Sequence, residues 1–433
     1  MPARRIRFDE EDRFGAFLWK RDEAPTGEGR LSGIPVAVKD NISTRGIPTT
    51  CGSRILEGYI PPYDAFVVDR LIAEGAAVVG KTNMDEFGMG TTTENSAYGP
   101  TRNPHDEGRV PGGSSGGSAA AIASGMVRMA LGTDTGGSIR CPAAFCGIVG
   151  LKPTYGRVSR YGLVAYANSL EQIGPMGRTV ADVSLLMEAI SGYDARDSTA
   201  ADRAYLHTPQ QEIRGLRVGV PEEFFGSGVD PAVAALVWKA IERLEECGAE
   251  IITCTMPSMA YALAAYYVTC MSEASSNLAR FDGVRYGPPC DVRSSWHDAF
   301  QERRKDGFGP EVRRRILLGT FALSSGYYGR YYAKAQAARA NVRADFARLF
   351  ADVDVLAGPT MPTIAFRFSE KSDPLSMYLS DILTVPANLA GVPAISVPCG
   401  TVRGMPVGLQ ITGRHFEDER VVDTAYVYEQ VAA

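Results

Sequence analysis

Histidine is scarce in this chain of 433 residues, which has only four, at positions 105, 207, 297 and 415. The eight cysteines are scattered, and no C-x-x-C pair or His/Cys group has the spacing of a zinc site. We therefore expect no metal site and predict reduced thiols in the protein interior. No stretch approaches the ~20 apolar residues of a membrane span, and the charged start MPARRIRFDEEDRF lacks the apolar core of a signal peptide. These absences favour a cytoplasmic protein without a membrane partner.

An excess of positive charge is also missing. The formal net charge is −5, which argues against a surface built as a whole to bind nucleic acid. Hydrophobic residues make up 45% and charged residues 22% of the chain, as in ordinary globular enzymes. No linker rich in Pro, Gly or Ser and no internal repeat divides the sequence. We therefore predict a single domain over residues 1–433.

Short β-branched runs alternate with helical patterns along the chain. The predicted strands cover residues 34–38, 76–79, 216–220, 251–253, 353–357, 394–397 and 407–412. The predicted helices cover residues 65–74, 118–129, 180–190, 231–247 and 418–431. Residues 260–350 are almost wholly helical in pattern, with helices over 311–322 and 327–350, and we interpret them as an elaboration of one core. This alternation predicts an α/β fold with a central mixed sheet covered by helices on both sides.

Two clusters of glycine and serine lie close together between Gly112 and Pro142, in GGSSGGSAAAIASGMVRMALGTDTGGSIRCP. Glycine lets the backbone approach a ligand closely. Neither cluster is a P-loop, because no lysine follows at the required place, and the chain has no G-x-G-x-x-G. Serine hydroxyls, backbone N–H groups and the upstream Lys39 in GIPVAVKD are the parts of an acyl-transfer site.

Two kinds of serine nucleophile fit this stretch. Ser115 matches the G-x-S-x-G nucleophile elbow, which needs an acid and then a histidine later in the chain. The other kind is a serine activated by lysine. A lysine accepts a proton only when it is neutral, so burial or nearby charge has to lower its pKa. Lys39 follows an apolar run, which suits a buried position at the end of a strand.

The motifs GGSSGGSAAAIASG and GTDTGGSIRCPAAFCGIVGLKPTYGRVS closely resemble the signature of the amidase signature family of serine hydrolases. The resemblance extends from about residue 31 to the end of the chain. It implies a Ser-cisSer-Lys catalytic set, in which Ser138 is the nucleophile, Ser114 is the bridging serine after a cis peptide bond, and Lys39 is the base.

The resemblance also implies an oxyanion hole built from backbone N–H groups of Thr135, Gly136 and Gly137, where the glycines leave the strip free of side chains. Ser115 and Ser118 are then interpreted as hydrogen-bonding residues of the loop and of the helix start.

Four further segments resemble one branch of this family, the glutaminase subunits of tRNA-dependent amidotransferases. They are residues 169–199, 273–287, 312–346 and 378–400. The branch implies that glutamine is hydrolysed here and that ammonia passes to a partner, the B subunit, which activates Glu-tRNA(Gln) or Asp-tRNA(Asn) with ATP and Mg²⁺. A small C subunit tethers the two. No cofactor is implied for this chain, and a free-standing amidase acting on another small amide is the alternative.

Recognition of glutamine requires charges that complement a zwitterion. Aligning the last two segments implies that Arg314 holds the α-carboxylate and Asp381 the α-ammonium group. The neighbouring Arg313 and Arg315 remain alternatives for the arginine. Tyr266 or Tyr267 either lines the pocket or packs in the core. The stretch before GIPVAVKD is several dozen residues shorter than is usual in this branch, which leaves the mode of assembly open.

Overall fold

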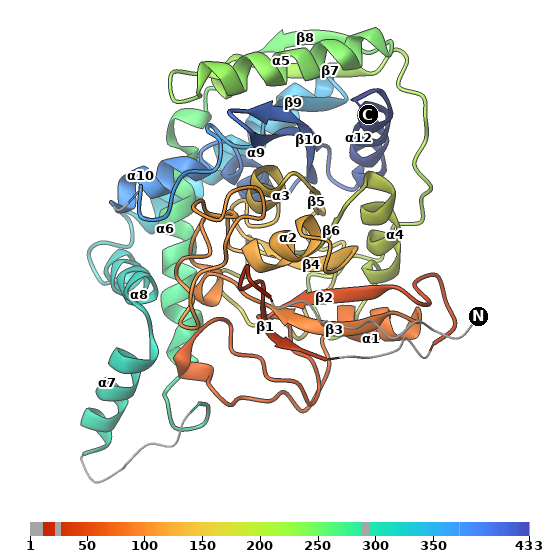
Figure 1. Ribbon diagram of the computed structural model, residues 1–433. Helices are drawn as coiled ribbons and strands as arrows, with labels where there is room; N and C mark the ends of the chain where they lie inside the picture. The colour runs from red at the N-terminus through yellow and green to blue at the C-terminus, as the bar shows by residue number, and fades with distance from the viewer. Residues whose placement is uncertain (1–11, 22–26, 288–294, 372, 433) are drawn as a thin grey trace.

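A computed structural model describes residues 12–21, 27–287, 295–371 and 373–432 of the chain (Figure 1). Its described strands form one sheet of eleven, in the order β1-β3-β2-β4-β6-β5-β10-β11-β9-β7-β8. The strands are β1 Phe17–Lys20, β2 Pro35–Lys39, β3 Ala77–Thr82, β4 Met129–Asp134, β5 Val149–Lys152, β6 Gln172–Gly177, β7 Arg217–Pro221, β8 Glu250–Cys254, β9 Val355–Pro359, β10 Ala394–Val402 and β11 Met405–Gly413.

The sheet is mixed. Strands β3, β2 and β4 run parallel, as do β9, β7 and β8, while the strands between these groups pair antiparallel. The α-helices are α1 Phe66–Ala73, α2 Gly116–Ala123, α3 Arg140–Cys146, α4 Val180–Ile190, α5 Pro231–Glu246, α6 Met259–Asn277, α7 Trp296–Gly307, α8 Pro310–Leu323, α9 Tyr332–Asp352, α10 Pro374–Tyr378, α11 Val385–Ala390 and α12 Asp418–Ala432. The predicted α/β class with a mixed sheet is confirmed.

Helices cover both faces of the sheet, as the alternation along β2 illustrates. Val36 and Val38 belong to a buried cluster that includes residues of α1, α4, α5 and α12. Ala37, between them, belongs to a second cluster, with the small residues of α2 and α3. Successive side chains of a strand point to opposite faces, so the two clusters lie on opposite sides of the sheet. Small residues let α2 and α3 approach the sheet closely.

The helical elaboration predicted over residues 260–350 consists of α6, α7, α8 and α9. Helices α8 and α9 both pack on α6, and α7 and α8 extend away from the sheet at the lower left of Figure 1. A Cβ on Gly319 of α8 would overlap the backbone carbonyl oxygen of Met271 in α6, so glycine allows the two helices to come this close. The elaboration meets the rest of the chain mainly through α6 and α9, which both pack against α11.

Two predicted helices differ from the structure by more than two residues at one end. The predicted helix over 118–129 ends at Ala123, and Met129–Asp134 is the central strand β4. The predicted helix over 327–350 begins only at Tyr332, after a turn. Seven described cysteines are free, and Cys290 lies outside the described residues. Within the described part of the chain, no helix is long and apolar enough to cross a membrane.

Candidate active site

The site lies where the parallel strands β2 and β4 end. Val38 of β2 pairs with Leu131 of β4, so the carboxyl ends of the two strands are neighbours. Lys39 is the last residue of β2, and Thr133 is next to last in β4. Loops that follow the carboxyl ends of parallel strands commonly form ligand sites. Here the two glycine–serine loops lie over this edge.

The amine of Lys39 is fully buried and surrounded by hydroxyl groups. Its Nζ lies 2.7 Å from Ser114 Oγ, 2.8 Å from Ser115 Oγ and 2.9 Å from Thr133 Oγ1. Burial lowers the pKa of Lys39 from 10.5 to about 7, although nearby carboxylates oppose the shift. A substantial fraction of the amine is therefore neutral near pH 7 and able to accept a proton.

The first serine loop carries Ser114 and Ser115 immediately before α2. The Gly113–Ser114 peptide bond is cis, as the family resemblance implies. The backbone N–H of Ser115 donates to the carbonyl oxygen of Ser138 at 3.1 Å, so the two serine loops touch. Lys39 and Ser114 are thus in direct contact, and the loop of Ser138 lies against that of Ser114. Their catalytic roles remain predictions.

A buried ion pair shapes the second serine loop. The Asp134 carboxylate accepts hydrogen bonds from the backbone N–H groups of Gly137, at 2.8 Å, and Ile139, at 3.1 Å. It also pairs with the guanidinium of Arg140 at 3.0 Å, with both side chains fully buried. Burial raises the pKa of Asp134, but the ion pair outweighs burial and holds it well below its usual range. A permanent negative charge therefore holds the loop in shape.

This geometry bears on the predicted oxyanion hole. The N–H of Gly137 donates to Asp134, so it is not free to donate to an oxyanion in this conformation. This differs from the expectation that Gly137 contributes to the oxyanion hole. Among the described residues, no acceptor takes the N–H of Gly136 or of Ser138. Those two groups and Thr135, in the same strip, are the backbone donors that remain available.

The strip of glycines is enclosed by side chains from distant segments. A Cβ on Gly136 would overlap the phenol oxygen of Tyr266 in α6. A Cβ on Gly137 would overlap the hydroxyl of Thr384, which itself donates to the carbonyl oxygen of Gly136 at 2.6 Å. Glycine is therefore required at both positions by close packing as well as by the positive φ of Gly137.

Asp381 is buried close to this strip. Its carboxylate accepts hydrogen bonds from the hydroxyl of Tyr267, at 2.6 Å, and of Thr91, at 3.1 Å. Burial raises the pKa of Asp381 to about 6, while these two hydrogen bonds and the charge of Arg315 oppose the shift. Tyr267 thus has a polar partner in the site, which the sequence left undecided.

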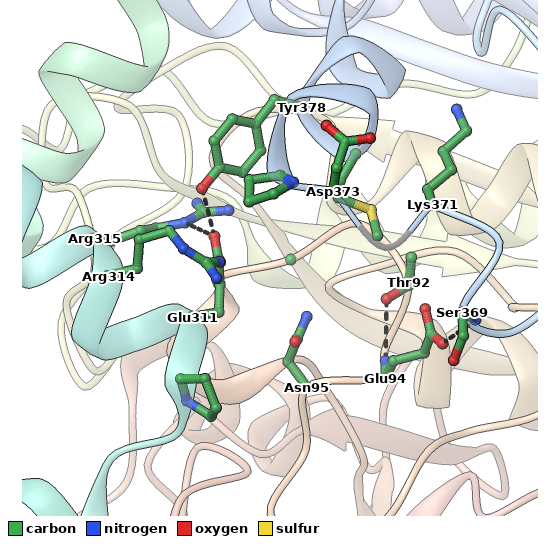
Figure 2. Close-up of a pocket in the computed structure, with 14 residues that line it drawn as sticks. Thr92, Glu94, Asn95, Glu311, Arg314, Arg315, Ser369, Lys371, Asp373 and Tyr378 are labelled. Carbon is green, nitrogen blue, oxygen red and sulfur yellow. Dashed lines mark hydrogen bonds and ion pairs between the residues drawn. The ribbon is translucent and has the colours of Figure 1, made fainter.

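A cavity of about 260 Å³ opens between α8 and the loop around Thr92 (Figure 2). Arg314 and Arg315 both line it, together with Glu311 and Tyr378. Arg315 is buried and donates to Glu311 at 2.7 Å and to the Tyr166 hydroxyl at 2.7 Å.

Arg314 also pairs with Glu311 but is open to solvent. Gly90 and Thr92 line this cavity on either side of Thr91, which binds Asp381. Asp381 and the predicted catalytic residues Lys39, Ser114 and Ser138 are not among the residues that line the cavity. The substrate roles of Arg314 and Asp381 therefore remain predictions.

Several residues of this site had no assigned role in the sequence analysis. Asp134 and Arg140 belong to the quoted motif GTDTGGSIR, and a buried ion pair within it could have been suspected from their charges. Thr133, in the same motif, gave no signal of its contact with Lys39. Thr91 and Tyr166 are far from both serine clusters in sequence, and only the fold brings them to the site.

Comparison with known proteins agrees with the geometry. Residues 9–422 match the model of the family described as Amidase. The chain is 69% identical to the A subunit of glutamyl-tRNA(Gln) amidotransferase from Methanospirillum hungatei, over 99% of both chains. It is 59% identical to the protein of the same name from Methanococcoides burtonii, over 93% of this chain and 85% of that one.

Among solved structures, the A subunit of glutamyl-tRNA(Gln) amidotransferase from Thermotoga maritima is similar with a TM-score of 0.83. It is 46% identical, and the match covers 96% of this chain and 87% of that one. The chain therefore belongs to the amidase family, in the branch of the glutamyl-tRNA(Gln) amidotransferase A subunits.

Proposed function

We propose that this chain is the glutaminase subunit of a tRNA-dependent amidotransferase. The observation that carries the proposal is the buried Lys39 amine, 2.7 Å from Ser114 and with its pKa lowered to about 7, in a chain 69% identical to one such subunit. A neutral amine against a serine pair supports acyl transfer without histidine or metal.

In the proposed reaction, Ser138 Oγ attacks the side-chain amide carbon of glutamine. Its proton passes to Ser114, whose own proton passes to Lys39. The backbone N–H groups of Gly136 and Ser138 stabilise the oxyanion. When the carbon–nitrogen bond breaks, the proton returns through Ser114 to the nitrogen, and ammonia leaves. A γ-glutamyl ester on Ser138 remains, and water hydrolyses it to glutamate by the same proton path.

Charge complementarity supports glutamine as the substrate. A zwitterionic amino acid needs a cation for its carboxylate and an anion for its ammonium group. Arg314 at the open side of the cavity and Asp381 beyond its inner loop provide one of each. Arg315 is the poorer candidate for the carboxylate, because Glu311 and Tyr166 already bind its guanidinium.

The ammonia would be used by the B subunit of the complex, held to this chain by a small C subunit. The B subunit would activate Glu-tRNA(Gln), or Asp-tRNA(Asn), with ATP and Mg²⁺, so both cofactors belong to the partner in this proposal. Since the acceptor is an aminoacyl-tRNA, we infer that the complex works in the cytoplasm.

Ser138→Ala in the full complex tests the proposal. Glutamine hydrolysis and glutamine-dependent amidation of Glu-tRNA(Gln) should both be lost, whereas amidation with added ammonium chloride should stay at the wild-type rate. The matched control is Ser118→Ala, because Ser118 is also buried and lies between the two serine loops in sequence, but bonds to Leu131 and Thr82. Near wild-type glutamine hydrolysis by Ser138→Ala would exclude Ser138 and make Ser115 the next nucleophile to test. A wild-type chain that prefers small neutral amides and needs no partner would favour the free-standing amidase.

A further inference from the structure

Six large apolar side chains are exposed together on α8 and the turn that follows it. They are Leu317, Leu318, Phe321, Tyr327, Tyr328 and Tyr331, and we call them the α8 apolar face. The ring of Phe321 lies 4.4 Å from that of Tyr327 and 5.6 Å from that of Tyr331. Leu317 and Leu318 precede Phe321 by four and three residues, so they share its side of the helix. Leu317, Leu318, Phe321, Tyr327 and Tyr331 therefore form one surface, and Tyr328 follows Tyr327 in the same turn.

Helix α8 does not need this surface for its own packing. Its buried residues are Val312, Arg315, Gly319 and Ala322, on the side that packs against α6. A surface helix normally places polar residues on its outer side, yet Leu317 here is 71% exposed. Clustered exposed apolar residues on a protein of this kind mark an interaction site.

The chain segment that carries the face has charged residues of one sign, although Glu311, just before it, pairs with Arg314 and Glu273 lies near Tyr332. Residues 312–344 contain seven lysines and arginines and no aspartate or glutamate, although the whole chain carries a net charge of −5. Arg313, Arg330 and Lys334 are exposed next to the α8 apolar face. A partner that complements this surface has an apolar centre and carboxylates at its rim.

The face is also continuous with the cavity that Arg314 lines. Arg314, which lines that cavity, is followed at three, four and seven residues by Leu317, Leu318 and Phe321. Residues with this spacing lie in one stripe along a helix. Whatever covers the α8 apolar face therefore lies beside the mouth of the cavity.

We propose that the α8 apolar face is the docking surface for a partner protein whose own surface is apolar at the centre and acidic at the rim. The inference rests on the proposed function, which gives this chain partner subunits. A protein fits better than RNA, because the rings of Phe321, Tyr327 and Tyr331 pack against one another, the Phe321 ring tilted against both, instead of standing free for bases. Leucine side chains also offer a base no stacking surface.

The test uses the full-length chain with its B and C subunits, and measures the affinity of assembly for Leu317→Glu and Phe321→Glu. We expect each substitution to lower the affinity of assembly at least tenfold, because it replaces an apolar contact at the centre of the interface by a buried charge. The matched controls are Leu206→Glu, at a loop residue that is 73% exposed, and Ile72→Glu, at an exposed residue of helix α1. Both should assemble as the wild type does.

A second pair of variants tests the rim without touching the apolar centre. Lys334→Glu should weaken assembly, and more so at low salt, whereas Lys239→Glu on the exposed side of α5 should not. The melting temperature and the glutaminase rate of each isolated variant report whether the fold is intact. If Phe321→Glu unfolds the chain, Lys334→Glu still decides the question.

Three results would overturn the inference. Wild-type assembly of Leu317→Glu, Phe321→Glu and Lys334→Glu would leave the proposed function standing and exclude this surface. Normal assembly with a selective loss of affinity for a tRNA(Gln) transcript would assign the face to RNA. Failure of the wild-type chain itself to assemble would remove the proposed function as well, and this outcome needs no variant to detect.

Discussion

Replacing Lys39 by methionine removes the amine and leaves an unbranched side chain one atom shorter, so most of the buried space at the end of β2 stays filled. Burial lowers the pKa of Lys39 to about 7. At pH 7 about half of the amines are then neutral, against about one in 3,000 for a lysine whose pKa is 10.5. The low pKa therefore supplies nearly all of the neutral base that the proposed mechanism needs at neutral pH.

A positioned general base typically contributes 10²–10⁴-fold to a rate. We accordingly expect Lys39→Met to lower kcat for glutamine hydrolysis about 10³-fold. In the wild type, kcat at saturating glutamine should rise with pH and level off above about pH 7. The residual kcat of Lys39→Met should not show this rise. Lys39→Arg should fail similarly, because a guanidinium stays protonated. Release of glutamate, followed across this pH range, measures all three.

The same pKa predicts an effect on stability, with a definite sign. Between about pH 7 and 10.5 the unfolded chain binds one more proton at Lys39 than the folded chain does, so the free energy of unfolding rises with pH in that window. Lys39→Met lacks this dependence. Its stability relative to the wild type should be greatest below pH 7 and fall by about 2 kcal/mol between pH 7 and 9. Urea unfolding at several pH values measures the difference.

Lys152→Met is the matched control. Burial also lowers the pKa of Lys152 to about 7, but its amine donates to the carbonyl oxygen of Pro153 and not to a serine, although the charges of Asp134 and Arg140 act on it. The stability of this variant relative to the wild type should change with pH as that of Lys39→Met does. Its kcat should fall less than tenfold and should still rise with pH up to about pH 7. A wild-type kcat that does not change with pH around pH 7, or an active Lys39→Arg variant, would refute the argument that neutral Lys39 is the base.

Three other substitutions test the remaining parts of the site. Ser115→Ala removes one of three hydroxyl partners of Lys39 and should lower kcat about tenfold, with little change in the KM for glutamine. Gly136→Ala should lower kcat for glutamine hydrolysis at least 100-fold, because its methyl group overlaps Tyr266. Adding Tyr266→Ala to the same chain should restore part of kcat. A double variant with a kcat no higher than that of Gly136→Ala would contradict the overlap with Tyr266 as the cause. Asp381→Asn should cost about 1.5–3 kcal/mol in kcat/KM for glutamine while sparing neutral amides, and equal losses on both substrates would argue against an ammonium contact.

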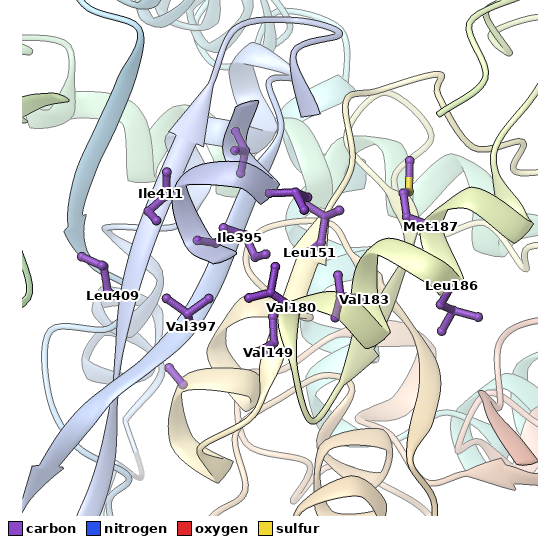
Figure 3. Packing of buried hydrophobic residues seen from close by; sticks show 14 of the residues in the cluster. Val149, Leu151, Val180, Val183, Leu186, Met187, Ile395, Val397, Leu409 and Ile411 are labelled. Atoms are coloured by element: carbon purple, nitrogen blue, oxygen red, sulfur yellow. The ribbon is translucent and has the colours of Figure 1, made fainter. Parts of the chain in front are cut away.

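The outer layer of the fold was predictable where helix periodicity is strong. The apolar pattern predicted a helix over 180–190, and α4 has those bounds. Thr179 caps its start by accepting the backbone N–H of Asp182 at 3.1 Å. Val180 and Val183 pack toward the strands that carry Val149 and Ile395 (Figure 3). Each of these signals is local, so the sequence alone contained them.

Strand β4 was not predictable in the same way. It is buried on both faces between β2 and β6, so Met129–Asp134 shows no alternation of apolar and polar residues. The predicted helix over 118–129 extended the small-residue pattern of α2 as far as Met129, and no strand was predicted for the residues that follow it. Gly125, with a φ of +87°, begins the turn that separates the two elements. The contact between Thr133 and Lys39 follows from the pairing of β2 with β4, which no local pattern encodes.

The choice among the three consecutive arginines shows why tertiary packing has to decide some site residues. The large apolar residues of α8 fall on two sides of the helix, so periodicity does not reveal which side is buried. In the structure, the close approach at Gly319 turns the side of α8 that carries Arg315 toward α6. Glu311, one turn earlier in α8, pairs with the Arg315 guanidinium. Arg314 is thereby left at the cavity, in one stripe with the exposed leucines. The packing that leaves Arg314 at the cavity is thus the same packing that exposes the α8 apolar face.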